Sequence, residues 1–157
     1  MTLLRIAITC LALLFAITGQ AESAYMVTHV YDGDTVELKN TDGRFKLRLA
    51  GIDAPERNQA YGQKSRRALA KLCKSDKVVV TAQILGTDKY NRSLGNLQCN
   101  HVDAGLYLIE QGLAWHYAKH SNNVMTKNAE LVARQKKRGL WKDKKPMPPW
   151  VWRQTHQ

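Results

Sequence analysis

Short segments in which apolar and polar residues alternate, or β-branched residues cluster, recur along the chain up to residue 99. Alternate residues of an extended segment point to opposite faces, so such segments predict strands with one buried face. The predicted strands are 25–31, 35–39, 44–50, 77–85 and 93–99. The turn formers Asp32-Gly33-Asp34 and Asp42-Gly43 separate the first three, and Asp-Gly is a strong signal for a hairpin.

Apolar residues at helical spacing predict three helices, at 62–74, 102–111 and 123–137. Gly112 follows the second helix and Gly139 lies just past the third, positions where glycine commonly ends a helix. Five strands with a helix inserted after the third, and helices after them, predict an α+β fold with a mainly β core. The expected architecture is a five-stranded, partly open OB-type barrel with about three packed helices, a type that commonly binds oligonucleotides.

The N-terminal residues 1–21 have the pattern of a secretory signal peptide. Arg5 precedes the uncharged apolar run 6–17, and small residues favour cleavage after Ala21, with Ala24 as the second choice. The run is shorter than the ~20 residues that a membrane-spanning helix needs. We therefore expect an exported protein, periplasmic or secreted, with no stable membrane anchor after cleavage.

The remainder of the chain divides into a domain at 22–144 and a basic tail at 145–157. Prolines lie among lysines and tryptophans in this tail, which we expect to be irregular, and we expect the protein to be a monomer. After signal cleavage two cysteines remain, Cys73 and Cys99. An even number in an exported chain favours a disulfide, and two separate buried thiols are the alternative.

The charge balance favours an anionic partner. Lysine and arginine together number 24, against 13 aspartates and glutamates, for a net charge of +11. Such a balance indicates a polyanion, with nucleic acid first and an anionic membrane surface second. A basic protein without a polyanionic ligand is the plainer alternative.

Acidic residues cluster on both sides of the third predicted strand, at Asp32 and Asp34 before it and at Asp53 and Glu56 after it. Hard cations such as Ca²⁺ bind several carboxylate oxygens from different parts of the backbone. Arg48 lies on the face of the strand opposite its core leucines, where it could bind a phosphate beside such a cation. The pattern predicts a metal-assisted phosphodiester site.

Each of these fragments has a plainer interpretation when it stands alone. Acidic turns are commonly solvated loops, and Arg48 could pair across the strands with Glu37. Lys89, Tyr90 and Arg92 could form a solvated hairpin tip or a tip that binds phosphate. Their order and spacing along one chain are a more specific signal for a phosphodiester site than any fragment alone.

Together the motifs resemble the staphylococcal nuclease-like, or thermonuclease, family over about residues 25–141. The family pattern is D-G-D-T, then R-L-x-G-I/V-D-x-P-E, then D-K/R-Y-G-R. This chain has D-G-D-T at 32–35, R-L-A-G-I-D-A-P-E at 48–56 and D-K-Y-N-R at 88–92. Many members carry Thr at the position of Ala54 and Gly at that of Asn91, but neither difference removes a catalytic group.

The resemblance implies roles for individual residues near a metal. Asp34 and Asp53 would bind Ca²⁺, with the backbone carbonyl of Ala54 as a further ligand. Glu56 would act through water, as the general base or as the group that positions the attacking water.

The resemblance also implies how the substrate is held. Arg48 and Arg92 would bind the scissile phosphate and stabilise its developing charge. Tyr90 and Tyr117 would contact a flanking phosphate or base, and Lys89 would add attraction for the backbone.

The implied function is an exported, calcium-dependent endonuclease that hydrolyses DNA and RNA and leaves 3′-phosphate ends. One alternative is a catalytically weak nucleic-acid-binding OB module at the cell envelope. Another is a surface protein bound to an anionic envelope, which leaves the spacing of acids and arginines unexplained. His116 and His120, four residues apart, also suggest zinc, but the sequence offers no obvious third ligand.

Overall fold

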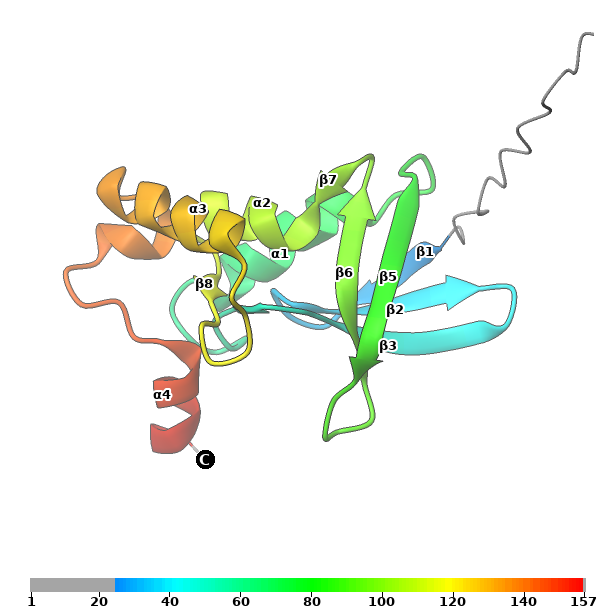
Figure 1. Cartoon of the computed structure of the whole chain (residues 1–157), viewed down its shortest axis with the longest axis horizontal. Helices are drawn as coiled ribbons and strands as arrows, with labels where there is room; N and C mark the ends of the chain where they lie inside the picture. Colours follow the sequence, from blue (N-terminus) through cyan, green and yellow to red (C-terminus); the bar gives the residue numbers. More distant parts are fainter. Residues whose placement is uncertain (1–24, 157) are drawn as a thin grey trace, which may run out of the picture.

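The structure is a computed structural model and describes residues 25–156. The predicted signal peptide at 1–21 lies outside the described residues. Figure 1 shows a curved sheet on one side of the molecule and a group of helices on the other. Within residues 25–156, no helix combines the length and the apolar character that a membrane crossing requires.

The main sheet has the strand order β1-β2-β3-β6-β5, and a short β7 pairs with β6. Its strands are β1 (Met26–Val30), β2 (Thr35–Asn40), β3 (Gly43–Leu49), β5 (Val80–Thr87), β6 (Ser93–Cys99) and β7 (Val102–Asp103). Neighbours in this order are antiparallel except β3 and β6, which run parallel. A separate two-stranded sheet joins β4 (Ile52–Asp53) to β8 (Trp115–His116). The predicted α+β fold with a mainly β core is confirmed.

The helices are α1 (Gly62–Cys73), α2 (Ala104–Glu110), α3 (Val124–Gln135) and α4 (Pro149–Thr155), with a 3₁₀ turn, η1, at Gly139–Lys142. Asp103 and Asn123 cap α2 and α3 by accepting bonds from the first backbone N–H groups of each helix. Gly112 ends α2 as predicted, with a φ of +64°. A side chain there would collide with the carbonyl oxygen of Arg138, 2.2 Å from the position of its Cβ.

The core lies between the inner face of the sheet and the helices. Leu47 and Leu49 of β3 are buried there with Leu69 of α1 and Leu108 of α2. Alternate positions of β3 therefore bury leucines, as the sequence pattern predicts. Arg48, between them, is directed to the other face of the strand.

A disulfide joins Cys73, at the end of α1, to Cys99, at the end of β6, with the two Cα atoms 5.3 Å apart. Both cysteines are buried. The predicted pairing is confirmed, and it fixes the inserted helix to the sheet.

The prediction of an irregular tail is wrong, because residues 149–155 form the helix α4. Pro149 occupies its first turn, where proline loses no helical hydrogen bond and its fixed φ favours the helix. Trp150 gives α4 an apolar face, and its ring lies 5.5 Å from the ring of Trp115 and 5.6 Å from that of Tyr117. This packing holds the end of the chain on the domain.

Candidate active site

The turn between β1 and β2 carries the first acidic group into the interior. Asp34 is 5% exposed, and its backbone N–H donates to Asp32 Oδ1 at 2.9 Å, which orders the turn. A Cβ on Gly33 would lie 2.0 Å from Ser65 Oγ and 2.7 Å from the Cβ of Ala54. Glycine is therefore needed for the turn to approach α1 and the loop after β4 so closely.

Arg48 connects this turn to the second acidic group. Its Nε lies 3.1 Å from Asp34 Oδ1, and its Nη2 lies 3.0 Å from Asp53 Oδ1. Nη1 donates to the backbone carbonyls of Leu49 and Ile52 at 2.7 and 3.0 Å. A bent backbone after β3 thus aims one guanidinium at two carboxylates from different segments.

The plainer interpretation of Arg48, an ion pair with Glu37, is wrong. The register of β2 and β3 places Arg48 opposite Thr35. Glu37 is opposite Lys46 instead and forms an ion pair with Arg44 at 3.6 Å.

The two aspartates are buried charges that Arg48 only partly compensates. Burial raises the pKa of Asp34 from its ordinary value of 3.8 to about 6, although the attraction of Arg48 lowers it. Burial also raises the pKa of Asp53, against the opposing effect of its hydrogen bond from Arg153. The cluster therefore favours an additional cation.

A hard cation suits the chemistry of this cluster. Asp34 and Asp53 offer carboxylate oxygens, the ligands that calcium prefers. The backbone N–H of Ala54 donates to Asp34 Oδ2 at 2.7 Å, which brings this loop residue against the first acidic turn. Residues 25–156 contain no group of three or more His, Cys, Asp or Glu side chains arranged to hold a metal ion. Calcium bound by the two aspartates would therefore need carbonyl and water ligands as well.

Glu56 lies at the edge of the cluster, beside an arginine that the sequence did not single out. Arg153 of α4 bonds to Glu56 Oε1 through Nη1 and to Asp53 Oδ2 through Nη2, both at 2.7 Å. The Glu56 side chain is 35% exposed, so it remains open to solvent. The sequence offers one signal for this contact: Pro149 can begin a helix, and Trp150 and Arg153, three residues apart, would then lie on one face of it.

The parallel pairing of β3 and β6 brings the segment of Arg92, the second predicted phosphate-binding arginine, alongside β3. Leu47 is opposite Ser93 in that register, so Arg92 comes one residue before the partner of Leu47. Its guanidinium bonds to Asp88 Oδ2 at 2.7 Å and, among the residues described, forms no ion pair with the acidic cluster. The fold thus aligns the two segments, while Asp88 holds the side chain of Arg92.

Lys89 and Tyr90 lie at the exposed tip between β5 and β6. The Lys89 Nζ is 4.9 Å from the centre of the Tyr90 ring, and Tyr90 is 67% exposed. Asn91 adopts a φ of +58°, so it takes the left-handed conformation at the position where the family commonly has glycine. The tip is therefore accessible to a ligand.

Tyr117 directly follows β8, the strand that pairs Trp115 with Asp53, and its backbone N–H donates to the Gly51 carbonyl at 2.9 Å. Its ring stacks on Trp150 and lies 4.9 Å from the ring of His120. His116 instead shares a hydrogen bond of 2.9 Å with Thr126. His116 therefore contacts Thr126, and His120 contacts Tyr117, neither of which is a usual zinc ligand.

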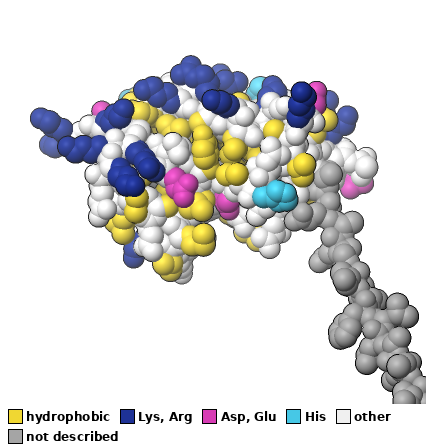
Figure 2. Space-filling view, turned by 90° about the horizontal axis from the view of Figure 1, so that it is seen from above, with side chains coloured by type: hydrophobic (Ala, Val, Ile, Leu, Met, Phe, Trp, Pro, Cys, Tyr) yellow, Lys and Arg dark blue, Asp and Glu magenta, His cyan; other side chains and the backbone are white. Residues whose placement is uncertain are grey.

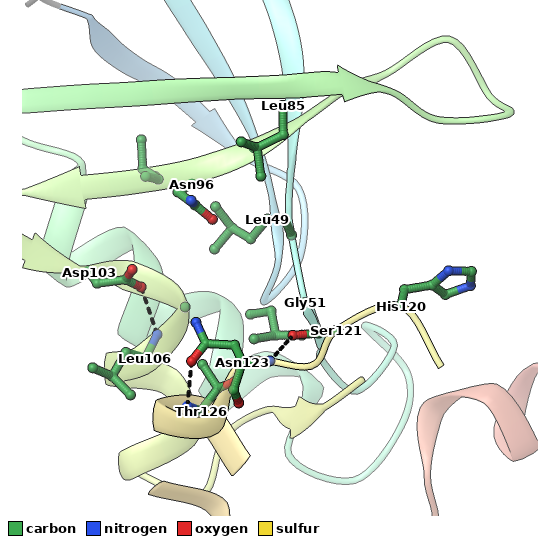
Figure 3. A pocket seen from close by; sticks show the side chains of 15 residues that line it. Leu49, Gly51, Leu85, Asn96, Asp103, Leu106, His120, Ser121, Asn123 and Thr126 are labelled. Atoms are coloured by element: carbon green, nitrogen blue, oxygen red, sulfur yellow. Dashed lines mark hydrogen bonds between the residues drawn. The ribbon is translucent and has the colours of Figure 1, made fainter. Parts of the chain in front are cut away.

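A pocket of about 220 Å³ lies elsewhere, between β6 and the start of α3. Figure 3 shows Asp103 and Asn123 at its wall, each bonded to the first turn of a helix. None of the side chains predicted for catalysis lines this pocket. Asp103 and Asn123 are thus engaged in capping α2 and α3.

A family profile described as "Staphylococcal nuclease homologue" matches residues 46–143, more than half of the chain. The chain belongs to this family. An endonuclease from Escherichia coli O157:H7, named as uncharacterized, is 36% identical over 128 residues, which cover 81% of this chain and 82% of the relative.

Two further relatives extend over nearly the whole chain. An uncharacterized endonuclease from Haemophilus influenzae is 34% identical and covers 98% of this chain and 87% of its own. A micrococcal nuclease from Shigella flexneri is 29% identical, with 97% and 92% covered. Family and names together support a nuclease.

Proposed function

We propose that this protein is a calcium-dependent endonuclease that hydrolyses DNA and RNA and leaves 3′-phosphate ends. The contacts of Arg48 with Asp34 and Asp53 carry the proposal. They place a guanidinium that can bind a phosphate beside two buried carboxylates that can bind a metal ion. Relatives named endonuclease and micrococcal nuclease support it. The net charge of +11 suits a polyanionic substrate, and Figure 2 shows lysines and arginines gathered along one margin of the molecule.

Asp34, Asp53 and the carbonyl of Ala54 would hold the calcium ion. When bound, the ion neutralises charge on the phosphate and makes it accessible to a nucleophile. Glu56 takes a proton from the attacking water while the water oxygen bonds to phosphorus. The bond between phosphorus and the 5′ oxygen breaks, this oxygen takes a proton from water to leave as a 5′-hydroxyl, and the phosphate stays on the 3′ side.

Arg48 and Arg92 hold the scissile phosphate and stabilise its additional negative charge. Both guanidiniums are bonded to aspartates without substrate, Arg48 to the cluster and Arg92 to Asp88. The phosphate must therefore replace part of these contacts. Lys89, Tyr90 and Tyr117 contact flanking phosphates or bases.

Cleavage of plasmid DNA and of RNA by the purified mature protein tests this proposal. We expect cleavage with calcium, none with chelator, and a large loss for Glu56→Gln. Glu110→Gln is the matched control, because Glu110 is exposed at the end of α2. Binding without cleavage by the wild type would favour the nucleic-acid-binding module, and unchanged cleavage in chelator would refute the calcium requirement.

We also propose that the protein is exported and acts in the periplasm or the medium. The signal-like pattern of 1–21 and the Cys73–Cys99 disulfide support export, since disulfides persist in oxidising compartments. N-terminal sequencing of protein recovered from those fractions should begin at residue 22, or at 25 for the second cleavage choice. Protein retained in the cytoplasm with its first residues intact would contradict the proposal.

A further inference from the structure

The guanidinium of Arg153 occupies the side of the acidic cluster that Arg48 leaves open. Arg48 bonds to Asp53 Oδ1 at 3.0 Å. Arg153 bonds to the other oxygen, Oδ2, at 2.7 Å and makes a longer contact of 3.3 Å with Oδ1. Arg153 also bonds to Glu56 Oε1 at 2.7 Å. One side chain from the end of the chain therefore binds a proposed calcium ligand and the proposed base together.

This contact is held by a packed segment. The Trp150 ring stacks on Tyr117 with 22° between the ring planes, and Trp150 lies one helical turn before Arg153. Gln59 connects the same segment to the loop of Glu56: its Nε2 donates to Met147 at 2.7 Å and its Oε1 accepts from the Glu56 N–H at 3.0 Å. Helix α4 thus delivers the guanidinium to a defined place.

A guanidinium and a calcium ion require the same oxygens of Asp53. Both are cations, so they also repel each other at this distance. The Arg153 side chain is 41% exposed, whereas that of Arg48 is 13% exposed. The Asp53 side chain is only 1% exposed, but the Arg153 end of the pair lies open to water. Arg153 can therefore leave the cluster and be hydrated at a smaller cost than Arg48.

We propose that Arg153 competes with calcium for Asp53 and Glu56, so that α4 sets the calcium concentration at which the site becomes active. The proposal rests on the calcium dependence proposed above. Arg153 compensates the buried carboxylate in the metal-free protein and keeps Glu56 engaged. Calcium binding displaces the guanidinium and releases Glu56 for the attacking water.

Calcium affinity, measured by titration calorimetry on the mature chain without substrate, tests the competition. Because Arg153 must leave before calcium binds, Arg153→Gln should bind calcium about three- to tenfold more tightly than the wild type. Arg153→Lys keeps the charge but lacks the fork that reaches both carboxylates, so its affinity should lie between the two.

The matched control is Arg57→Gln, which removes the same charge one residue from Glu56. Arg57 is exposed, so this change should alter the affinity much less than Arg153→Gln. Equal effects of the two glutamine variants would reduce the role of Arg153 to general charge and overturn the proposal.

Two further outcomes separate this proposal from the one on which it rests. Unchanged or weaker calcium binding by Arg153→Gln, with normal circular dichroism, would overturn the competition and leave the calcium dependence standing. Calcium binding by none of the proteins at millimolar concentration, with cleavage that persists in chelator, would overturn both proposals.

Discussion

Protonation of Asp34 should stabilise the metal-free protein as the pH falls. The folded state binds this proton more tightly than the unfolded state, because burial raises the pKa of Asp34 from 3.8 to about 6. As the pH rises from 3.8 towards 6, Asp34 loses its proton in the unfolded chain before it does so in the folded protein. The contribution of Asp34 to stability is therefore present at low pH and is lost as the pH rises through about 6. At 1.36 kcal/mol for each pKa unit, the difference amounts to about 3 kcal/mol.

The comparison with Asp34→Asn isolates this group, since other carboxylates titrate in both proteins. Urea unfolding in chelator, from pH 7 to pH 4, should show the free energy of unfolding of the wild type rising by about 2 kcal/mol relative to the variant, because at pH 4 the unfolded chain is still partly deprotonated. Asp42→Asn is the control, because Asp42 is exposed at the hairpin tip. This variant should have the same pH profile as the wild type. Parallel profiles for wild type and Asp34→Asn would refute the account of a buried, undercompensated charge.

Three other variants test the remaining parts of the account. Arg48→Ala should lower the cleavage rate by about 10²–10³, because it removes a preorganised phosphate contact, and retention of wild-type kcat would contradict that role. A double serine variant of Cys73 and Cys99 should lose about 3.5 kcal/mol of the free energy of unfolding, because the disulfide closes a separation of 26 residues. An unchanged urea midpoint would contradict this stabilising role. Gly112→Ala should lower Tm by several degrees through its positive φ and its collision with Arg138, and an unchanged Tm would show that the end of α2 rearranges without cost.

The local features of the fold were readable from the sequence. Alternating residues predicted β3 with its leucines buried and Arg48 on the other face, because each side-chain direction follows from strand geometry alone. The motifs at 32–35 and 48–56 likewise predicted which acids would approach each other. Turns and strands of this kind depend on neighbouring residues, which is why local patterns were sufficient.

Contacts between distant segments were not readable in the same way. Arg153 is 100 residues from Asp53, and its role depends on a helix that starts in a proline-rich segment. The prolines suggested irregular chain, but the packing of Trp150 on Tyr117 favours the helix. The ion pair between Arg92 and Asp88 was also missed, because only the folded tip shows which group that arginine engages.

The most direct test of the central claim is the rate at which wild type and Glu56→Gln cleave a labelled DNA oligonucleotide at saturating calcium, with the product masses recorded. We predict 3′-phosphate products from the wild type and a rate about 10²–10⁴ lower for the variant, since general base catalysis contributes that much. Calcium affinity measured on the same variant verifies that the site is intact. Cleavage by Glu56→Gln at the wild-type rate, or products that carry 5′-phosphate, would contradict the account.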